Sequence, residues 1–402
     1  MSHTPVVLRN SRVVLPDRVS ESANVLIESG RISRISSVPD VPASDARDED
    51  LQDLTLFPGF IDLHIHGAVG IDTMDATAHD LNRVSQFLIG QGVTAWVPTL
   101  VPANLKTYQA AVEAIQLAML PEPFGSQAGS DKSRPSRARV LGVHYEGPFV
   151  NAAQCGALRS EHFRSYSASA DLDDLPIPTG QDAVRLMTLA PEVEGGVELV
   201  RELNRRGWVA LIGHTRAEVN ILDQAFQAGA RHLTHFMNAM PALHHRSVGP
   251  VGWGLLRDDV TCDIIADGIH LDKLMLGLLL KTKTRERLTL ISDSIAAAGK
   301  GDGEYEIWGE TIVVKQGRTS NSRGSIAGSV ITMLDAAKMM KSIGAEETDI
   351  ARMTATNPAK VLGLDHDVGS IEEGKRADLV ALNRAGVVKL VVIGGEIVYD
   401  QR

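Results

Sequence analysis

The sequence PGFIDLHIHG, residues 58–67, begins the part of the chain that decides the fold. This apolar run ends in two histidines, and a longer helical pattern follows it. The same alternation continues to about residue 293, as expected for repeated βα units around a parallel sheet. Eight units of this kind predict an α/β fold, the TIM (β/α)8 barrel, with its chemistry at the C-terminal ends of the strands. The eight predicted strands lie near residues 59–66, 93–100, 140–146, 185–190, 209–214, 232–236, 261–266 and 288–293.

The two ends of the chain have a different pattern, made of short strands rather than βα units. Apolar runs at 6–8 and 13–15 and a hairpin pattern at 24–32 precede the barrel, and strand patterns return at 377–383 and 390–399. We expect the two ends to pair into one small β-sandwich domain beside the barrel.

These patterns divide the chain into parts and loops. The acidic stretch 45–53 and the polar stretch 125–139 are predicted loops, because charged or polar residues dominate them. The predicted parts are residues 1–56 and 364–402 for the two halves of the β-sandwich, and 57–363 for the barrel, with a hairpin inserted at about 304–319.

Composition and charge narrow the classes of partner and location. Of 402 residues, 44% are hydrophobic and 22% charged, and the formal net charge of −10 disfavours a nucleic-acid partner. Residues 1–12 lack the apolar core of a signal peptide, and no run approaches the ~20 apolar residues of a membrane helix. Cys155 and Cys262 stand outside any CxxC motif and are expected to be reduced thiols. We therefore expect a cytoplasmic protein without a nucleic-acid or membrane partner.

Residues of metal-ligand type recur at the ends of the predicted strands. His64 and His66 end the first strand, and their spacing turns both imidazoles to the same side of it. As a pair they are either metal ligands or barrel-lining histidines held by hydrogen bonds. Later strand ends add Glu146, His214, His235 and Asp293. One carboxylate and two imidazoles leave a position open for water, which is the arrangement of a catalytic divalent metal site.

This set of residues predicts metal-assisted hydrolysis. A metal lowers the pKa of its bound water to about 7 and polarises a carbonyl, while a carboxylate takes the proton of the water and returns it to the leaving group. We assign that carboxylate to Asp293, which lies on the last strand, outside the cluster of Glu146 and two histidines. Glu146 would be shared if two ions bind. Histidine and carboxylate ligands suit Zn, Fe, Mn or Co.

Longer motifs resemble one known family over essentially the whole chain. They are PGFIDLHIHG (58–67), HYEGPF (144–149), LAPE (189–192), GHT (213–215), THFMNAMPALHHR (234–246), IADGIH (265–270), SDSIAAAG (292–299) and GSIAGS (324–329), with closing segments at 354–364 and 369–383. The chain resembles the N-acetylglucosamine-6-phosphate deacetylases of the amidohydrolase superfamily. The resemblance implies hydrolysis of N-acetylglucosamine 6-phosphate to glucosamine 6-phosphate and acetate, with one or two divalent ions per subunit.

The resemblance also implies a role for individual residues. The implied metal ligands are Glu146, His214 and His235, with His64 and His66 for a second ion, and the implied catalytic residue is Asp293. The implied substrate contacts are Ala157, His270 for the sugar and its acetyl group, and Asn238, the Ala239 backbone and Arg246 for the phosphate. A guanidinium and backbone N–H groups suit a phosphate. In this family the arginine can reach the site of a neighbouring subunit, which implies a homodimer.

Two departures from the family pattern leave the exact substrate open. Leu158 stands where the family usually has a histidine that touches sugar hydroxyls, and leucine cannot form that hydrogen bond. Arg246 is followed by Ser-Val-Gly-Pro instead of the usual Glu-Pro-Gly. The alternatives are a galactosamine isomer or an unphosphorylated N-acyl sugar. A metal-free scaffold protein of the same fold is a further alternative, disfavoured because every expected ligand position is filled.

Overall fold

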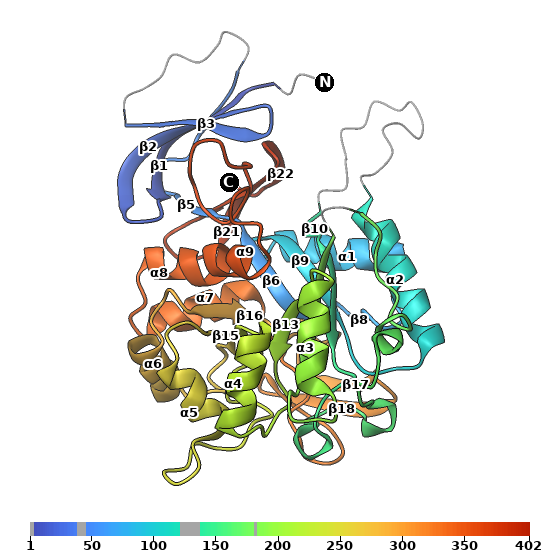
Figure 1. Cartoon of the computed structure of the whole chain (residues 1–402). Coiled ribbons are helices and arrows are strands. Elements are labelled where there is room, and N and C mark those ends of the chain that lie inside the picture. Colours follow the sequence, from blue (N-terminus) through green and yellow to red (C-terminus); the bar gives the residue numbers. More distant parts are fainter. Residues whose placement is uncertain (1–3, 38–45, 121–136, 181–182) are drawn as a thin grey trace.

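A parallel barrel forms the body of the molecule in the computed structural model, which describes residues 4–37, 46–120, 137–180 and 183–402 (Figure 1). The backbone N–H of Asp293 donates to the carbonyl of His64 at 2.9 Å, so the last strand meets the first and the barrel is nearly closed. The predicted TIM-like barrel is confirmed. In spatial order its strands are β6 (Phe60–Ile65), β9 (Val93–Leu100), β11 (Gly142–Glu146), β12 (Val184–Leu189), β13 (Val209–Ile212), β14 (His232–Leu233), β15 (Thr261–Ile265) and β16 (Leu288–Ile291), with short β10 (Arg139–Val140) beside β9.

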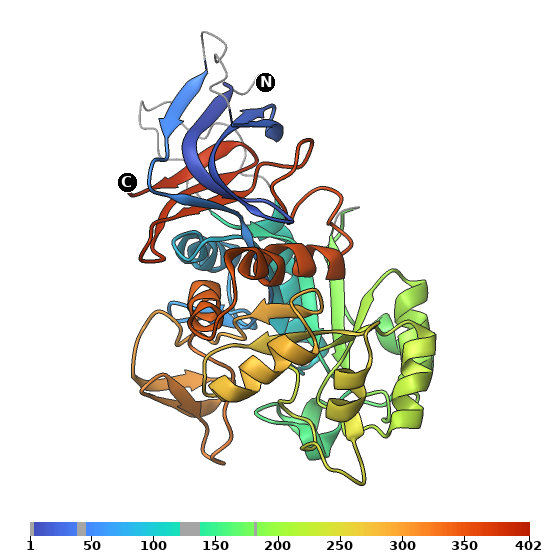
Figure 2. The same cartoon turned by 90° about the vertical axis from the view of Figure 1, so that its left-hand side faces the viewer.

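Helices cover the outside of the barrel (Figures 1 and 2). The first begins where Thr77 and Asp80 form a capping box, and its Leu81, Val84 and Leu88 recur at helical spacing and are buried. The helices are α1 (Ala78–Ile89), α2 (Leu105–Met119), α3 (Gly196–Arg205), α4 (Val219–Ala228), α5 (Gly249–Leu256), α6 (Lys273–Thr282), α7 (Met333–Ser342), α8 (Glu347–Ala351) and α9 (Asn357–Val361). Shorter turns are η1 (Ala152–Gln154), η2 (Ser160–His162), η3 (Ser169–Leu172) and the π-helical η4 (Arg352–Thr356).

Apolar side chains fill the barrel interior and the space beneath the helices. Leu63, Val97 and Leu186, from three different strands, belong to a buried cluster inside the barrel. A second and larger cluster, which includes Trp96 and Phe236, lies between the strands and the helices. The strand ends that carry the polar side chains therefore rise from a buried, apolar interior.

The two chain ends form one sheet beside the barrel, at the top of Figure 1. They join through β5 and β20, which pair antiparallel with Leu56 opposite Ala381. Both of these side chains are fully buried in the sheet's own apolar core. The predicted β-domain built from both termini is confirmed. Its strands are β1 (Val6–Val14), β2 (Val19–Glu28), β3 (Arg31–Ser36), β4 (Arg47–Asp50), β5 (Thr55–Pro58), β20 (Leu379–Leu382), β21 (Val388–Ile393) and β22 (Glu396–Asp400).

Local expectations in the terminal regions need two corrections. The run 6–8 and the first two residues of the run 13–15 lie in one strand, β1, which is irregular between Leu8 and Ser11, with a φ of 57° at Asn10. The loop prediction was wrong at Arg47–Asp50, which pairs parallel with β1. Its charged side chains suit an edge strand, where they face solvent and pair with neighbours such as Arg9.

The predictions for loops and boundaries have separate outcomes. Of the predicted loop 125–139, residues 125–136 lie outside the described part of the chain. The domain boundaries at 56/57 and 363/364 stay predictions. Among the described residues, no helix combines the length and apolar composition that crossing a membrane requires.

A small antiparallel sheet interrupts the barrel after β16. Its strands are β17 (Gly303–Ile307), β18 (Glu310–Lys315) and β19 (Arg318–Ser320). The turn between the first two strands consists of Trp308 and Gly309, both with positive φ, at 54° and 75°. A two-strand ribbon, β7 (Gly67–Ala68) and β8 (Ile71–Asp72), follows the first barrel strand.

Candidate active site

Six polar side chains meet at the C-terminal end of the barrel, where the strands deliver them. Glu146 is the last residue of β11, and His214, His235 and Asp293 lie two residues beyond β13, β14 and β16. The latter three have φ of 46°, 32° and 48°, so the chain turns sharply at each. Such conformations cost free energy and are concentrated at functional sites. Together with His64 and His66, these residues are at most 7% exposed.

Glu146, His214 and His235 form the tightest group. Glu146 Oε1 is 2.9 Å from His214 Nε2 and 3.0 Å from His235 Nε2, and the two nitrogens are 3.0 Å apart. His214 Nδ1 donates to the carbonyl of Gln154 at 2.8 Å, so in the neutral imidazole Nε2 carries the lone pair. That lone pair faces a carboxylate oxygen and another imidazole nitrogen. A positive charge among these atoms would stabilise the arrangement.

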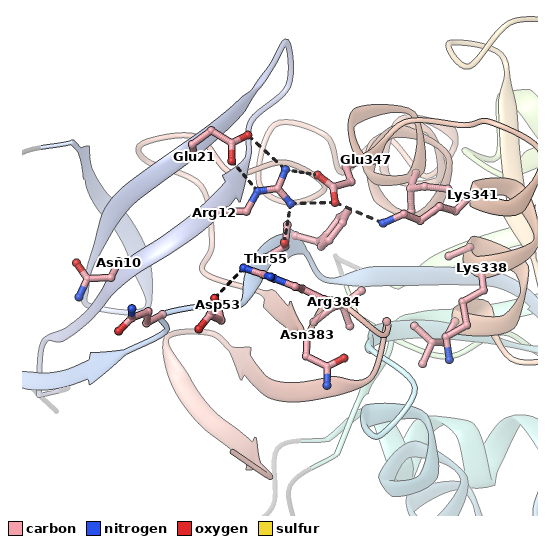
Figure 3. A pocket seen from close by; sticks show the side chains of 17 residues that line it. Asn10, Arg12, Glu21, Asp53, Thr55, Lys338, Lys341, Glu347, Asn383 and Arg384 are labelled. Carbon is pink, nitrogen blue, oxygen red and sulfur yellow. Dashed lines mark hydrogen bonds and ion pairs between the residues drawn. The ribbon is translucent and has the colours of Figure 1, made fainter.

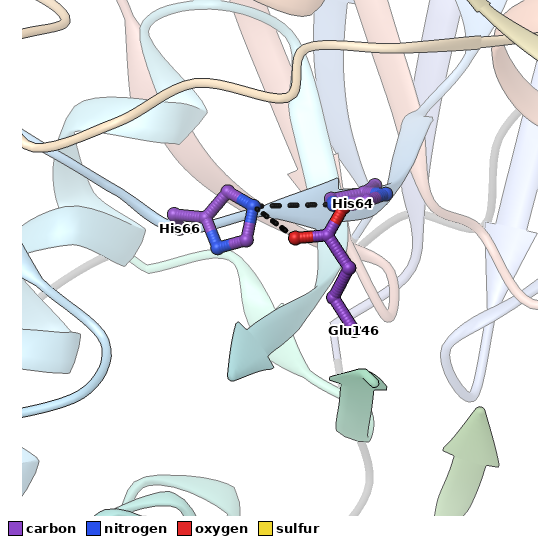
Figure 4. A group of neighbouring side chains, drawn as sticks. All are labelled: His64, His66 and Glu146. Atoms are coloured by element: carbon purple, nitrogen blue, oxygen red, sulfur yellow. Dashed lines mark hydrogen bonds and ion pairs between the residues drawn. The ribbon is translucent and has the colours of Figure 1, made fainter. Parts of the chain in front are cut away.

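His64 and His66 face the same carboxylate (Figure 4). His64 Nε2 is 3.4 Å from Glu146 Oε1, His66 Nε2 is 3.4 Å from Glu146 Oε2, and the two nitrogens are 3.2 Å apart. Glu146 therefore belongs to two groups of three ligand-type residues. This geometry matches a carboxylate shared between two ions.

Both groups fit a divalent metal ion. Ligand atoms about 2.1 Å from one ion lie about 3.0–3.4 Å from one another, and the separations within the two groups are close to these values. The donors are imidazole nitrogens and carboxylate oxygens, which suit Zn, Fe, Mn or Co. The residues present can therefore hold one or two ions.

Burial and charge oppose each other at these residues. Burial raises the pKa of Glu146, but interactions with His64 and His214 outweigh it and hold that pKa well below its ordinary range. Burial also lowers the pKa of His64 well below its ordinary value. Burial lowers the pKa of His235 as well, but the hydrogen bond and charge of Glu146 outweigh it and raise that pKa to about 9. Metal binding requires an ionised carboxylate and neutral imidazoles, so an ion at this group would displace the proton of His235.

Asp293 lies beside the histidine pair of β6. Its Oδ1 is 3.3 Å from His66 Nε2 and 3.5 Å from His64 Nε2. Its backbone carbonyl accepts from the N–H of Ser329 at 2.7 Å, which holds the residue in place. The carboxylate borders the pocket, so it can exchange a proton with a molecule bound there.

Five of the six residues, all but the fully buried His64, line a pocket of about 310 Å³ at the barrel mouth. The predicted substrate contacts Ala157, Asn238, Ala239 and His270 all line it. Arg246 lies on an exposed loop, apart from the lining of this pocket in its own chain. Apart from this arginine, the structure brings the predicted site residues together.

Comparison with known proteins decides the family. The model of the amidohydrolase family matches residues 55–398. The chain belongs to this family. The amidohydrolase is 35% identical over 403 residues to N-acetylglucosamine-6-phosphate deacetylase of Bacillus subtilis, an alignment that covers 98% of this chain and 97% of that protein. It is 34% identical to N-acetylgalactosamine-6-phosphate deacetylase of Escherichia coli O157:H7, over 97% of this chain and 98% of the relative. The solved N-acetylglucosamine-6-phosphate deacetylase of Thermotoga maritima matches with a TM-score of 0.85 and 32% identity, covering 98% and 100% of the two chains.

Buried aspartates hold the strand ends of the amidohydrolase site, and the sequence analysis missed them. Asp263 accepts from the backbone N–H of His235. Asp62 accepts from the N–H of His64 at 3.4 Å and of Ser292 at 3.2 Å, so it joins the first strand to the last. An aspartate in the middle of an apolar strand, as at Asp62 and Asp263, was the available signal, but the partners Ser292 and His235 come from distant parts of the chain.

A third aspartate orients His270. The His270 Nδ1 is 2.6 Å from Asp267 Oδ2, whose other oxygen accepts from the His270 backbone N–H at 2.8 Å. Burial raises the pKa of Asp267, but the hydrogen bond and charge of His270 outweigh it and lower that pKa. Because Nδ1 is hydrogen-bonded to Asp267, Nε2 is the ring nitrogen that can contact a molecule in the pocket.

The amidohydrolase pocket also contains residues to which the sequence analysis assigned no contact. They include Leu158, Trp308, Ser325 and Ile326. The last two fall in the quoted motif GSIAGS, which was a usable signal. Trp308 is at the tip of the inserted hairpin, and no local pattern indicates that this tip reaches the barrel mouth.

A larger cavity, of about 600 Å³, lies between the terminal sheet and α7, away from the metal-ligand groups (Figure 3). Its charged side chains pair with one another: Arg12 bonds to Glu21 and Glu347, and Arg384 pairs with Asp53. The Arg12–Glu347 pair connects the terminal sheet to α8, whereas Arg12–Glu21 and Arg384–Asp53 join residues of the terminal segments. The smaller pocket, which holds the metal-ligand groups, is therefore the candidate active site.

Proposed function

We propose that this amidohydrolase is a metal-dependent deacetylase that hydrolyses N-acetylglucosamine 6-phosphate to glucosamine 6-phosphate and acetate. The observation that carries the proposal is the position of Glu146 between two histidine pairs, with Asp293 3.3 Å from His66. The names of the relatives from Bacillus subtilis and Thermotoga maritima support the substrate.

The proposed cofactor is one or two divalent ions, of Zn, Fe, Mn or Co. Glu146, His214 and His235 would hold one, and His64 and His66 would hold a second with the same carboxylate. A bound ion supplies Lewis acidity, which lowers the pKa of water and polarises an amide carbonyl. The shared position of Glu146 favours two ions.

Asp293 is the proposed proton carrier. Its carboxylate accepts a proton from the attacking water, and the resulting acid delivers that proton to the amine nitrogen as the C–N bond breaks. His270, oriented by Asp267, is proposed to contact the sugar and its acetyl group. Ala157 contributes a further substrate contact.

The phosphate is proposed to bind to the Asn238 side chain, the Ala239 N–H and an Arg246 from a second subunit. The exposed loop that carries Arg246 supports this arrangement, because the arginine is available to a partner chain. The proposed assembly is therefore a homodimer. Because a sugar phosphate is charged and does not cross a bilayer unaided, we also propose a cytoplasmic location.

An N-acetylgalactosamine 6-phosphate deacetylase is the second candidate. Two observations favour it: the 34% identity to the Escherichia coli relative of that name, and Leu158 in place of a histidine. An unphosphorylated N-acyl sugar is disfavoured if the phosphate contacts hold. The metal-free scaffold is disfavoured because the six residues converge.

One assay separates these candidates. Purified, metal-analysed protein is given N-acetylglucosamine and N-acetylgalactosamine, each with and without a 6-phosphate, and acetate release is measured. We expect the highest kcat/KM for the phosphorylated gluco sugar. Faster turnover of N-acetylgalactosamine 6-phosphate would make that sugar the substrate. Equal rates for the phosphorylated and unphosphorylated sugars would overturn the role of Arg246. Metal-free protein without activity on any sugar would favour the scaffold.

A further inference from the structure

One side of the active-site pocket is an apolar wall formed by Leu158 and Trp308. Both residues line the pocket and pack in one hydrophobic cluster with Val101 and Val150. Leu158 is 3% exposed and Trp308 is half-buried. The indole nitrogen of Trp308 is buried. The wall therefore presents carbon to the pocket.

The backbone that places Trp308 is unusual. A two-residue hairpin turn with positive φ at both positions favours Asn-Gly, whereas this turn is Trp308-Gly309. A bulky side chain in this conformation costs about 1 kcal/mol or more, so surrounding contacts must hold it. Trp308 packs against both the Leu158 cluster and the apolar core of the inserted sheet.

Arg323 fixes the wall from outside. Its Nη2 donates to the carbonyl of Ala157 at 3.2 Å and lies 3.7 Å from the carboxylate of Glu310. Ala157 precedes Leu158, and Glu310 follows the Trp308-Gly309 turn. One guanidinium thus joins the two segments that form the wall.

The wall lies at the reacting end of the pocket. The Trp308 ring meets the His66 ring edge to face, with centroids 5.1 Å apart. His66 Nε2 is in turn 3.3 Å from Asp293 Oδ1 and 3.4 Å from Glu146 Oε2. The proposed phosphate contacts follow β14, which is three strands from β11 and three from β6 around the barrel. The amide that is cleaved must lie beside Asp293 and the metal-ligand groups, which brings its acyl group toward the Trp308 side of the pocket.

We propose that Leu158 and Trp308 select the acyl group of the substrate, favouring unsubstituted acetyl over hydroxylated N-glycolyl. This inference rests on the proposed deacetylase function and names its acyl specificity. A hydroxyl against a carbon wall loses its hydrogen bonds to water without replacing them. An apolar pocket discriminates against an added hydroxyl by about 10- to 100-fold.

The kinetic test compares the N-acetyl and N-glycolyl forms of the same amino-sugar 6-phosphate. Wild type is expected to favour acetyl in kcat/KM by about 10- to 100-fold. Leu158→Asn places a polar group in the wall, and Trp308→Gly removes the indole while tolerating the positive φ. Both are expected to bring the acetyl-to-glycolyl ratio close to one. Val313→Asn, on the exposed face of the same hairpin, is the control and should keep the wild-type ratio.

A binding test separates the proposed acyl selection by the wall from the proposed deacetylase activity. Acetohydroxamate and glycolohydroxamate chelate a metal through the same atoms and differ by one hydroxyl, so their Kd values for the Zn2+-loaded protein are measured by calorimetry. We expect tighter acetohydroxamate binding in wild type and a lost preference in both wall variants. The proposed acyl selection would be overturned if wild type bound the two hydroxamates equally or bound neither. It would also be overturned if both wall variants kept the wild-type preference for acetohydroxamate. Inactivity on every amino-sugar phosphate with this preference intact would overturn the deacetylase alone.

Discussion

Replacing Asp293 with asparagine tests the proposed chemistry most directly. The change keeps the size of the side chain and removes its ability to carry a proton. A positioned acid or base contributes typically 10²–10⁴-fold to the rate. We therefore expect kcat to fall by about 10³-fold, equivalent to about 4 kcal/mol in the activation barrier.

The same variant should keep its metal. Glu146, His214 and His235 lie within 3.0 Å of one another and do not depend on the carboxylate of residue 293. The loss should therefore appear in kcat while bound metal, measured by elemental analysis, stays close to wild type.

The assay is acetate release at saturating substrate, with Asp80→Asn as the matched control. Asp80 belongs to the capping box of α1 on the exposed surface, so the same chemical change there should leave kcat unaltered. An Asp293→Asn enzyme that retains metal and turns over within tenfold of wild type would refute the assignment of the proton carrier. Loss of metal together with activity would make the aspartate a ligand instead.

Three further predictions concern metal, stability and thiol reactivity. Glu146→Gln should reduce binding of both ions. Dialysis of the wild-type protein against a chelator should abolish activity and lower the Tm, and adding metal should restore the activity and the Tm. Lys283→Met should lose about 3 kcal/mol of unfolding free energy, because the buried ammonium donates to three backbone carbonyls, whereas exposed Lys281→Met should change little in urea unfolding. Burial raises the pKa of the Cys262 thiol to about 12, so this cysteine should react slowly with iodoacetamide at pH 8. We expect peptide mass spectrometry of the labelled native protein to find the label at half-buried Cys155. Equal labelling of Cys155 and Cys262 would contradict this.

The barrel could be predicted because its strands are encoded locally. Short apolar runs such as 93–100 and 261–266 are long enough for a buried strand and are separated by helical patterns. The structure places strands at Val93–Leu100 and Thr261–Ile265. Edge strand β4 was missed, because the charged sequence Arg47–Asp50 has no apolar signal and pairs through its backbone.

The positions of the ligand-type residues at strand ends were also readable. In parallel strands all C-terminal ends meet at one edge, so Glu146 and His214 had to approach each other wherever β11 and β13 were correct. Their supporting contacts were not readable. Asp62 bonds to the backbone of Ser292, which lies on a strand far away in the chain.

The order of the βα units and the residues that reach the barrel mouth follow from the local sequence, because strand periodicity and strand ends are properties of short segments. Tertiary structure alone decided that Glu146 lies between two histidine pairs and that Trp308 joins Leu158 in one wall. These arrangements depend on closure of the barrel and on the return of a distant hairpin over it. Contacts of that kind arise when remote segments bury surface together, so they leave no pattern in either segment.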